Sequence, residues 1–363
     1  MNHQPAATAT PAPVVRGTDG RTPAAPPRPR KRPATGALLG LALGDALGLP
    51  TEFDDVPSIL ATCGPWRGMD LPRPAWITDD TQMTLALARG LRTARGRAPI
   101  GPVRLARAVR EEFVDWYHSP DNNRAPGRTC MTACALLDSG RPWQEASQTG
   151  SKGCGANMRV APLGLAPGLT PEEQAGAAQL QSALTHGHPT ALAASDLTAH
   201  AVRLLAEGTE VTGLVGRLRS YALRQRRTYH ERWLGDLWTR TPSDTGPEEF
   251  IARGWDDCLA ALDRLTAALR DPAPELDPCL ATGEGWIAEE ALATALHCFL
   301  LFPEEPLLAL RRAACTSGDS DSIACLAGAF AGAHLGADAW PDTWTAHLEH
   351  RTELMAFGAL WDA

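Results

Sequence analysis

The sequence lacks the patterns that mark several large classes of protein. Alternating β-branched residues of the kind found in strands are nearly absent, which argues against a fold built on β-sheets. Uniformly apolar runs of about 18 residues or more are also missing, so the sequence predicts no membrane span. The first residues contain no basic segment followed by an apolar stretch, and we therefore expect no secretory signal.

Paired cysteines are missing as well. The nine cysteines include no CxxC pair and their number is odd, which argues against a disulfide framework or a zinc knuckle. Cys130 and Cys134 have a spacing that would suit a metal, but no second Cys or His pair lies nearby, so packing is the favoured interpretation. We therefore expect reduced thiols in a cytoplasmic protein.

Positive charge is scarce. Lys and Arg number 34 against 42 Asp and Glu, which gives a formal net charge of −8. Nucleic acid is therefore not expected as a partner, since binding to phosphate backbones needs a basic stripe. The only basic run, Arg28–Arg32, lies within residues 1–33, a Pro/Ala-rich segment that we predict to be a disordered tail because it has few large apolar side chains.

Apolar residues recur every three or four positions through the rest of the chain, which is the period of a buried helix face. The sequence therefore predicts one all-α domain over residues 34–363, which we expect to be a monomer. Long connections over 49–78, 119–128, 140–170 and 228–246 are expected to build binding surfaces. The predicted helices are 35–48, 79–96, 102–118, 129–139, 171–185, 188–207, 210–227, 247–270, 285–302, 304–316, 321–336 and 347–360.

The first predicted helix carries an unusual stripe of glycines, at positions 36, 40, 44 and 48. Glycine costs about 1 kcal/mol relative to alanine inside a helix, so four of them on one face predict the close approach of another backbone. Asp45 lies within the same apolar helix and needs hydrogen-bond donors there, so we expect it to cap neighbouring loops.

Two acidic clusters, Thr78–Thr81 and Gly318–Ser322, lie about 240 residues apart, and each runs directly into an Ala-rich helix. A helix N-cap needs only one such residue, and each cluster holds more. Carboxylates beside hydroxyls suit hard cations such as Mg²⁺ or Mn²⁺, so the two clusters could share a two-metal site. Glu52 follows Pro50 in an exposed connection and is free to face the same cleft.

Three further segments have weaker patterns. Gly153–Pro162 is a loop whose glycines expose backbone N–H groups that can cradle a phosphate, with Arg159 adding charge. Thr185–Pro189 is a turn with two histidines, for which a surface or capping role is favoured over a ligand or catalyst. Trp286 could be a core anchor or a stacking face, and the core is favoured.

Taken in order, these segments resemble the ADP-ribosylglycohydrolase family. The family pattern is a GDALG-x-P-x-E opening, a TDDT helix start, a glycine-rich loop ending in MR-x-A-P, a TH-x-HP turn, a G-x-GW-x-AEEAL helix and a final GD-[ST]-D-[ST] cluster. This chain carries them at 44–52, 78–81, 153–162, 185–189, 283–292 and 318–322. The resemblance implies a compact, single-domain orthogonal helical bundle with two Mg²⁺ or Mn²⁺ ions in a cleft.

The resemblance also implies roles for individual residues. Glu52 and Asp80 are the catalytic candidates, and the residue patterns alone do not choose between them. Cys154 departs from the family, in which many members have Asn at this position. By motif position, the substrate-binding residues are Gly153, Cys154, Gly155 and His186, and the metal ligands are Thr78, Asp79, Asp80, Asp319, Asp321 and Ser322.

The activity that the resemblance implies is hydrolysis of the glycosidic bond between ADP-ribose and an acceptor, either a protein side chain or a small molecule, with release of ADP-ribose. One alternative is a catalytically idle member that binds ADP-ribose or serves a structural role. Another is a dinuclear-metal phosphohydrolase, although such sites normally include several histidines. The intact acidic clusters favour the hydrolase, because converging carboxylates are costly to desolvate without a function.

Overall fold

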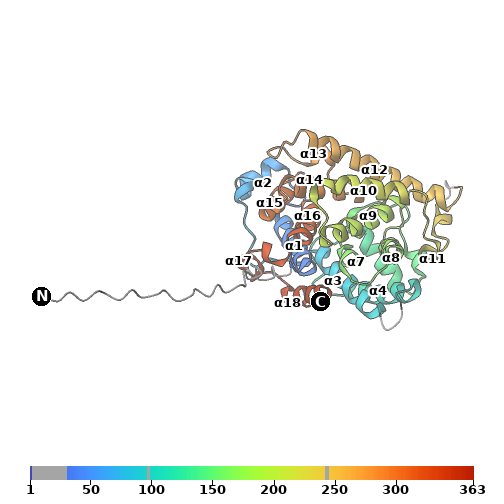
Figure 1. Ribbon diagram of the computed structural model, residues 1–363. Coiled ribbons are helices and arrows are strands. Elements are labelled where there is room, and N and C mark those ends of the chain that lie inside the picture. The colour runs from blue at the N-terminus through green and yellow to red at the C-terminus, as the bar shows by residue number, and fades with distance from the viewer. Residues whose placement is uncertain (2–30, 96–98, 242–244) are drawn as a thin grey trace. The chain divides into compact units, whose positions relative to one another are not determined.

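The computed structural model describes residues 1, 31–95, 99–241 and 245–363 (Figure 1). Within it, Lys31–Ala363 forms one compact unit. Most of the predicted tail, residues 1–33, lies outside the described residues, and the first helix already begins at Pro33.

The part of the chain that the structure describes is helical, with three isolated β-bridges and no β-strand. The predicted all-α fold is therefore confirmed. The helices are α1 Pro33–Gly48, α2 Val56–Cys63, α3 Asp79–Arg95, α4 Pro102–Tyr117, α5 Arg128–Asp138, α6 Trp143–Ala146, α7 Ala161–Leu165, α8 Pro171–Ala183, α9 Pro189–Ala206, α10 Leu214–Gln225, α11 Glu231–Leu234, α12 Pro247–Arg270, α13 Cys279–Thr282, α14 Ala288–Leu301, α15 Pro306–Ala314, α16 Ser320–Leu335, α17 Asp342–Thr345 and α18 Arg351–Asp362.

Every helix predicted from the sequence is present, with ends that differ by a few residues. The sequence missed the short helices α2, α6, α7, α11, α13 and α17, most of which lie in the predicted long connections. Helix α2 illustrates the reason. Asp55 caps its start, Pro57 lies in its first turn and Gly64 ends it, so it is too short to show a helical period.

Helices α1 and α16 pack with almost nothing between their backbones, although they lie near opposite ends of the sequence of the compact unit (Figure 1). A Cβ atom at Gly40 would overlap the backbone of Gly328, and one at Gly48 would overlap the backbone of Asp321. These contacts proceed in opposite directions along the two helices, so the pair is antiparallel. The predicted close approach of a second backbone to the glycine stripe is confirmed.

The segment Pro33–Thr51, which contains α1, is long and apolar enough to cross a membrane by length and composition alone, with a mean hydropathy of 1.2. The predicted absence of a membrane span stays a prediction. However, 89% of this stretch is buried inside the protein, and it packs against α16 and α18. Burial of this kind is typical of the central helix of a globular domain.

Candidate active site

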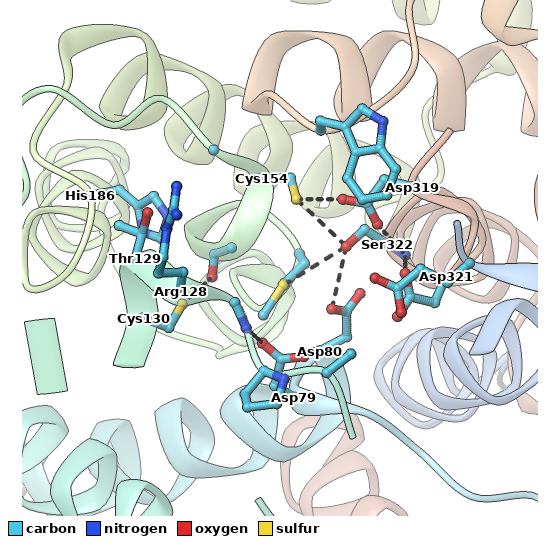
Figure 2. Close-up of a pocket in the computed structure, with 18 of the residues that line it drawn as sticks. Asp79, Asp80, Arg128, Thr129, Cys130, Cys154, His186, Asp319, Asp321 and Ser322 are labelled. Atoms are coloured by element: carbon cyan, nitrogen blue, oxygen red, sulfur yellow. Dashed lines mark hydrogen bonds between the residues drawn. The ribbon is translucent and has the colours of Figure 1, made fainter. Parts of the chain in front are cut away.

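A cavity of about 460 Å³ opens where both acidic clusters meet the glycine-rich loop (Figure 2). Its wall combines carboxylates, backbone-exposing glycines and two aromatic side chains at one edge. The lining residues are Glu52, Phe53, Asp79, Asp80, Ala125, Pro126, Gly127, Arg128, Thr129, Cys130, Gly153, Cys154, Gly155, Met158, His186, Trp286, Asp319, Asp321 and Ser322.

Helix α1 positions both acidic clusters. Its buried Asp45 accepts hydrogen bonds from the backbone N–H groups of Thr78 at 3.0 Å and Thr81 at 3.1 Å, and from the Thr81 hydroxyl at 2.5 Å. These bonds fix the start of α3. At the same C-terminal end of α1, Gly48 lies against Asp321 at the start of α16. The capping role predicted for Asp45 is confirmed.

The two clusters meet through direct contacts. Ser322 Oγ donates a hydrogen bond to Asp80 Oδ1 at 3.3 Å across 242 positions of sequence. Carboxylate oxygens of Glu52, Asp319 and Asp321 all lie within 4.8 Å of one another. The chain therefore folds back as the shared-site hypothesis requires, and it carries Glu52 with it.

The remaining predicted ligands differ in their positions. Asp79 lines the cavity and accepts a hydrogen bond from Gly127 N–H at 3.1 Å. Thr78 is fully buried, and its hydroxyl accepts a 3.3 Å hydrogen bond from the backbone of Asp80. It is not part of the cavity wall, so the structure brings five of the six predicted ligands to the cavity.

The cluster carries negative charge at high electrostatic cost. Burial, with repulsion from Asp319 and Asp79, raises the pKa of Glu52 to about 8. Burial is also the main cause that raises the pKa of Asp79 to about 7 and holds that of Asp80 well above its usual range. Asp80 Oδ2 is buried without a hydrogen-bond partner. Unpaired buried carboxylate oxygens are the chemistry that a divalent cation neutralises, so the residues present fit Mg²⁺ or Mn²⁺.

The glycine-rich loop is held from both sides. Cys154 N–H donates to Trp286 O at 3.1 Å, which ties the loop to the segment before α14. His186 lies beneath the loop, with its Nε2 3.4 Å from the point where a Cβ of Gly153 would be. Burial and the nearby Arg159 lower the pKa of His186 to about 3, so the ring is neutral. Gly153, Cys154, Gly155 and His186 therefore share one wall of the cavity, as predicted for substrate binding.

Three interpretations of the sequence were wrong. The histidines of the Thr185–Pro189 turn were expected at the surface or in caps, but only His188 is a cap, and His186 is buried and lines the cavity. Arg159 was expected to add charge for a phosphate, but it is fully buried and donates to Gly155 O at 2.9 Å and to Gln181 Oε1 at 2.9 Å. It supports the loop from inside the protein. Trp286 was expected in the core, but it is 37% exposed at the cavity edge and stacks on Phe53, with ring centroids 5.5 Å apart.

Sequence reasoning missed Phe53, Arg128 and Thr129, all of which line the cavity. Arg128 and Thr129 begin α5, directly after the connection predicted over 119–128. That long connection was the available signal, since long loops in a compact helical domain often carry binding residues.

The sequence pattern of the ADP-ribosylglycohydrolase family matches residues 25–363. The chain belongs to the ADP-ribosylglycohydrolase family. This confirms the resemblance that the ordered motifs suggested, and with it the predicted enzyme class, an ADP-ribosyl glycohydrolase.

Known members and a solved structure agree with this assignment. This family member is 28% identical to the ADP-ribosyl-[dinitrogen reductase] glycohydrolase of Rhodospirillum rubrum, over 88% of this chain and 91% of that protein. It is also 28% identical to ADP-ribosylhydrolase ARH3 of Mus musculus, over 88% and 89% of the two chains. A solved ADP-ribosylglycohydrolase-related protein complex superposes with a TM-score of 0.63 at 25% identity, covering 92% of this chain and 97% of that one.

Proposed function

We propose that this protein hydrolyses the glycosidic bond between ADP-ribose and a protein side chain or a small molecule, using two Mg²⁺ or Mn²⁺ ions and releasing ADP-ribose. The observation that carries the proposal is the meeting of the two acidic clusters at one cavity, where Ser322 Oγ and Asp80 Oδ1 are 3.3 Å apart. The residues that would hold the ions are Asp79, Asp80, Asp319, Asp321 and Ser322, with Thr78 supporting Asp80 from behind.

Cleavage of such a bond passes through an oxocarbenium-like state, in which positive charge builds on the ribose ring and negative charge on the leaving group. When bound, the ions supply a template for the ribose hydroxyls and acidify a water molecule. The carboxylates of this chain surround the ring position with negative charge. They therefore stabilise the charge that develops there.

Glu52 is the group that we assign to proton transfer. It is only half-buried at the cavity edge, whereas Asp80 is 2% exposed and contacts Ser322. In the metal-free site, burial and neighbouring carboxylates raise the pKa of Glu52 to about 8. A carboxyl at the cavity edge can exchange a proton with the leaving nitrogen or oxygen, or with water, as the bond breaks.

The opposite wall binds the rest of the substrate. Gly153 and Gly155 line the cavity with backbone that no side chain covers, beside a neutral His186, an arrangement that suits the diphosphate and ribose. Phe53 and Trp286 offer apolar ring surface at the rim.

All nine cysteines are free thiols, which supports a cytoplasmic setting.

The test is an ADP-ribose release assay on arginine-, serine- and small-molecule-linked substrates, with Mg²⁺, Mn²⁺ or a chelator. We expect release from at least one substrate class with a divalent ion and loss of release with the chelator. Release of phosphate in place of ADP-ribose would favour a phosphohydrolase, and equal turnover in the chelator would refute the metal centre.

A further inference from the structure

A sulfur atom lies among the oxygen donors of the acidic cluster. Cys154 Sγ donates a hydrogen bond to Asp319 Oδ2 at 2.8 Å and lies 3.7 Å from Ser322 Oγ. Figure 2 shows the Cys154 thiol on the cavity side of its loop, directed toward Asp319 and Ser322. The thiol therefore faces the residues that we assign to the metal centre.

The backbone fixes this position. Cys154 begins a short 3-10 turn, Cys154–Ala156, in which its carbonyl accepts a hydrogen bond from Asn157 N–H at 2.7 Å. On the other side, its own N–H is bonded to Trp286 O at 3.1 Å. The sulfur is thus placed by two anchored segments rather than by a free loop.

An independent observation shows that the cluster lacks a positive partner. Asp80 is 2% exposed, and its Oδ2 atom has no hydrogen-bond partner, while its Oδ1 accepts the hydroxyl of Ser322. An orphaned carboxylate oxygen buried beside other carboxylates points to a cation as the missing partner. The sulfur and the Oδ1 atom of the same carboxylate both contact Ser322 Oγ, at 3.7 and 3.3 Å.

We propose that Cys154 Sγ is a ligand of the metal centre and gives it affinity for thiophilic divalent ions of the Zn²⁺ and Cd²⁺ class, beyond what oxygen donors alone provide. The inference rests on the proposed function, because it requires the acidic cluster to hold a metal. As the metal–sulfur bond forms, the S–H bond breaks and its proton leaves to solvent. Soft thiolate donors select such ions over Mg²⁺.

The geometry suits two neighbouring ligands of one ion. In a tetrahedral site, bonds of about 2.3 Å to sulfur and 2.1 Å to oxygen would place the two donor atoms about 3.6 Å apart. The distance between Cys154 Sγ and Asp319 Oδ2 is 2.8 Å, so the two atoms would move apart by less than about 1 Å as the ion binds.

The other thiol in the cavity wall does not share this position. Cys130 Sγ lies 3.6 Å from Arg159 Nη1 and 3.8 Å from Gly155 O. A cationic guanidinium beside a thiol competes with a metal ion. Cys154 is therefore the thiol that the fold directs into the acidic cluster.

The experiment uses the full chain, freed of metals by a chelator, and Cd²⁺ or Mn²⁺ as the probe. The wild type, Cys154→Ser and the combination of both substitutions are compared with Cys63→Ser as a matched control, because Cys63 is exposed and could bind Cd²⁺ on its own. Thiolate-to-cadmium charge-transfer absorption in the ultraviolet reports the sulfur ligand. Calorimetric titration gives the affinities.

We expect the band in the wild type and in Cys63→Ser but not in Cys154→Ser. The Cd²⁺ affinity of Cys154→Ser should fall at least about tenfold, whereas its Mn²⁺ affinity should change less than about threefold. A band that persists when Cys154→Ser is combined with Cys63→Ser overturns the inference.

The two proposals fail separately. If the wild type binds Mn²⁺ and releases ADP-ribose but shows no cadmium band, the sulfur ligand is refuted and the proposed function stands. If neither ion binds the wild type, the metal centre is absent and both proposals fall.

Discussion

At the scale of single residues, Asp321 combines a cost to stability with a role in the site. Burial and repulsion from Asp80 and Asp319 hold its pKa well above the ordinary range, so its charge destabilises the metal-free fold. Asn keeps the shape and can still accept the 2.8 Å bond from Ser322 N–H. Functional sites commonly trade stability for chemistry in this way.

We predict that Asp321→Asn lowers ADP-ribose release at least about 100-fold and raises the melting temperature of the chelator-treated protein. Asp342→Asn, at an exposed acid on α17, serves as the control and should change neither property. Kinetic assays and thermal melts check both effects. Full activity in Asp321→Asn would contradict its role as a ligand.

Asp196 is a buried acid far along the sequence from both acidic clusters. It accepts hydrogen bonds from Tyr221 Oη at 2.7 Å and from Gln179 Nε2 at 3.0 Å. Burial nevertheless raises its pKa from 3.8 to about 6. Between these values the unfolded chain releases the proton while the folded protein keeps it, so the free energy of unfolding falls as the pH rises.

The direction of the pKa shift of Asp196 gives a second prediction. Relative to Asp196→Asn, the wild type should lose about 3 kcal/mol of stability between pH 4 and pH 7, the equivalent of about two pKa units. Urea unfolding of both proteins at several pH values measures the difference. A difference that stays constant with pH would show that Asp196 ionises normally in the fold.

Individual residues were predictable to the extent that their role follows from local chemistry. Asp45 in an apolar helix needs hydrogen-bond donors, and backbone N–H groups at the start of α3 supply them. Arg159 and Trp286 were assigned wrongly, because both lie in irregular segments without a period to show which side faces the interior. Whether such a side chain is buried depends on elements distant in sequence.

At the scale of elements, the antiparallel pair of α1 and α16 sets the geometry of the site. The sequence showed that one face of α1 is made of small residues, and so predicted a close neighbour. Gly328 and Gly332 marked α16 as another tightly packed helix, but no pattern showed that these two helices pack against each other. Small residues determine how closely another helix can approach, but they do not determine which helix it is.

We predict that Gly44→Ala destabilises the protein by about 3 kcal/mol or more, because its Cβ would overlap the backbone of Ala324, which cannot move alone. The matched control is Gly216→Ala in the exposed part of α10, where a Cβ meets nothing within 4 Å. This control should be neutral or more stable by up to about 1 kcal/mol. Thermal or urea unfolding compares them, and equal stabilities would contradict the packing argument.

At the scale of the whole molecule, the buried carboxylates make stability depend on both pH and metal. The folded-state pKa values of Asp79 and Glu52, about 7 and 8, exceed their ordinary values of 3.8 and 4.5. These two carboxyls therefore contribute most to the stability of the metal-free fold below their ordinary pKa values, and that contribution is lost as the pH rises through their folded-state values of about 7 and 8. A bound divalent cation favours the ionised carboxylates and reverses this trend.

We predict that Mg²⁺ or Mn²⁺ raises the melting temperature more at pH 8 than at pH 5.5. The gain at an ion concentration 100 times the dissociation constant corresponds to about 2.7 kcal/mol per site. Scanning fluorimetry with each ion and with a chelator checks this, and Na⁺ at matched ionic strength is the control. A larger gain at the lower pH would contradict the assigned direction of the pKa shifts.

The pairing of α1 with α16 also determines at which stage of its synthesis the protein can complete its fold. Helix α1 forms its close contact with α16, such as that of Gly36 with Gly332, only after roughly 300 residues have left the ribosome. Contacts between such distant segments slow folding, because a long loop must close before they form. A nascent chain therefore stays inactive until its last helices emerge, and a product truncated before α16 has no catalytic centre.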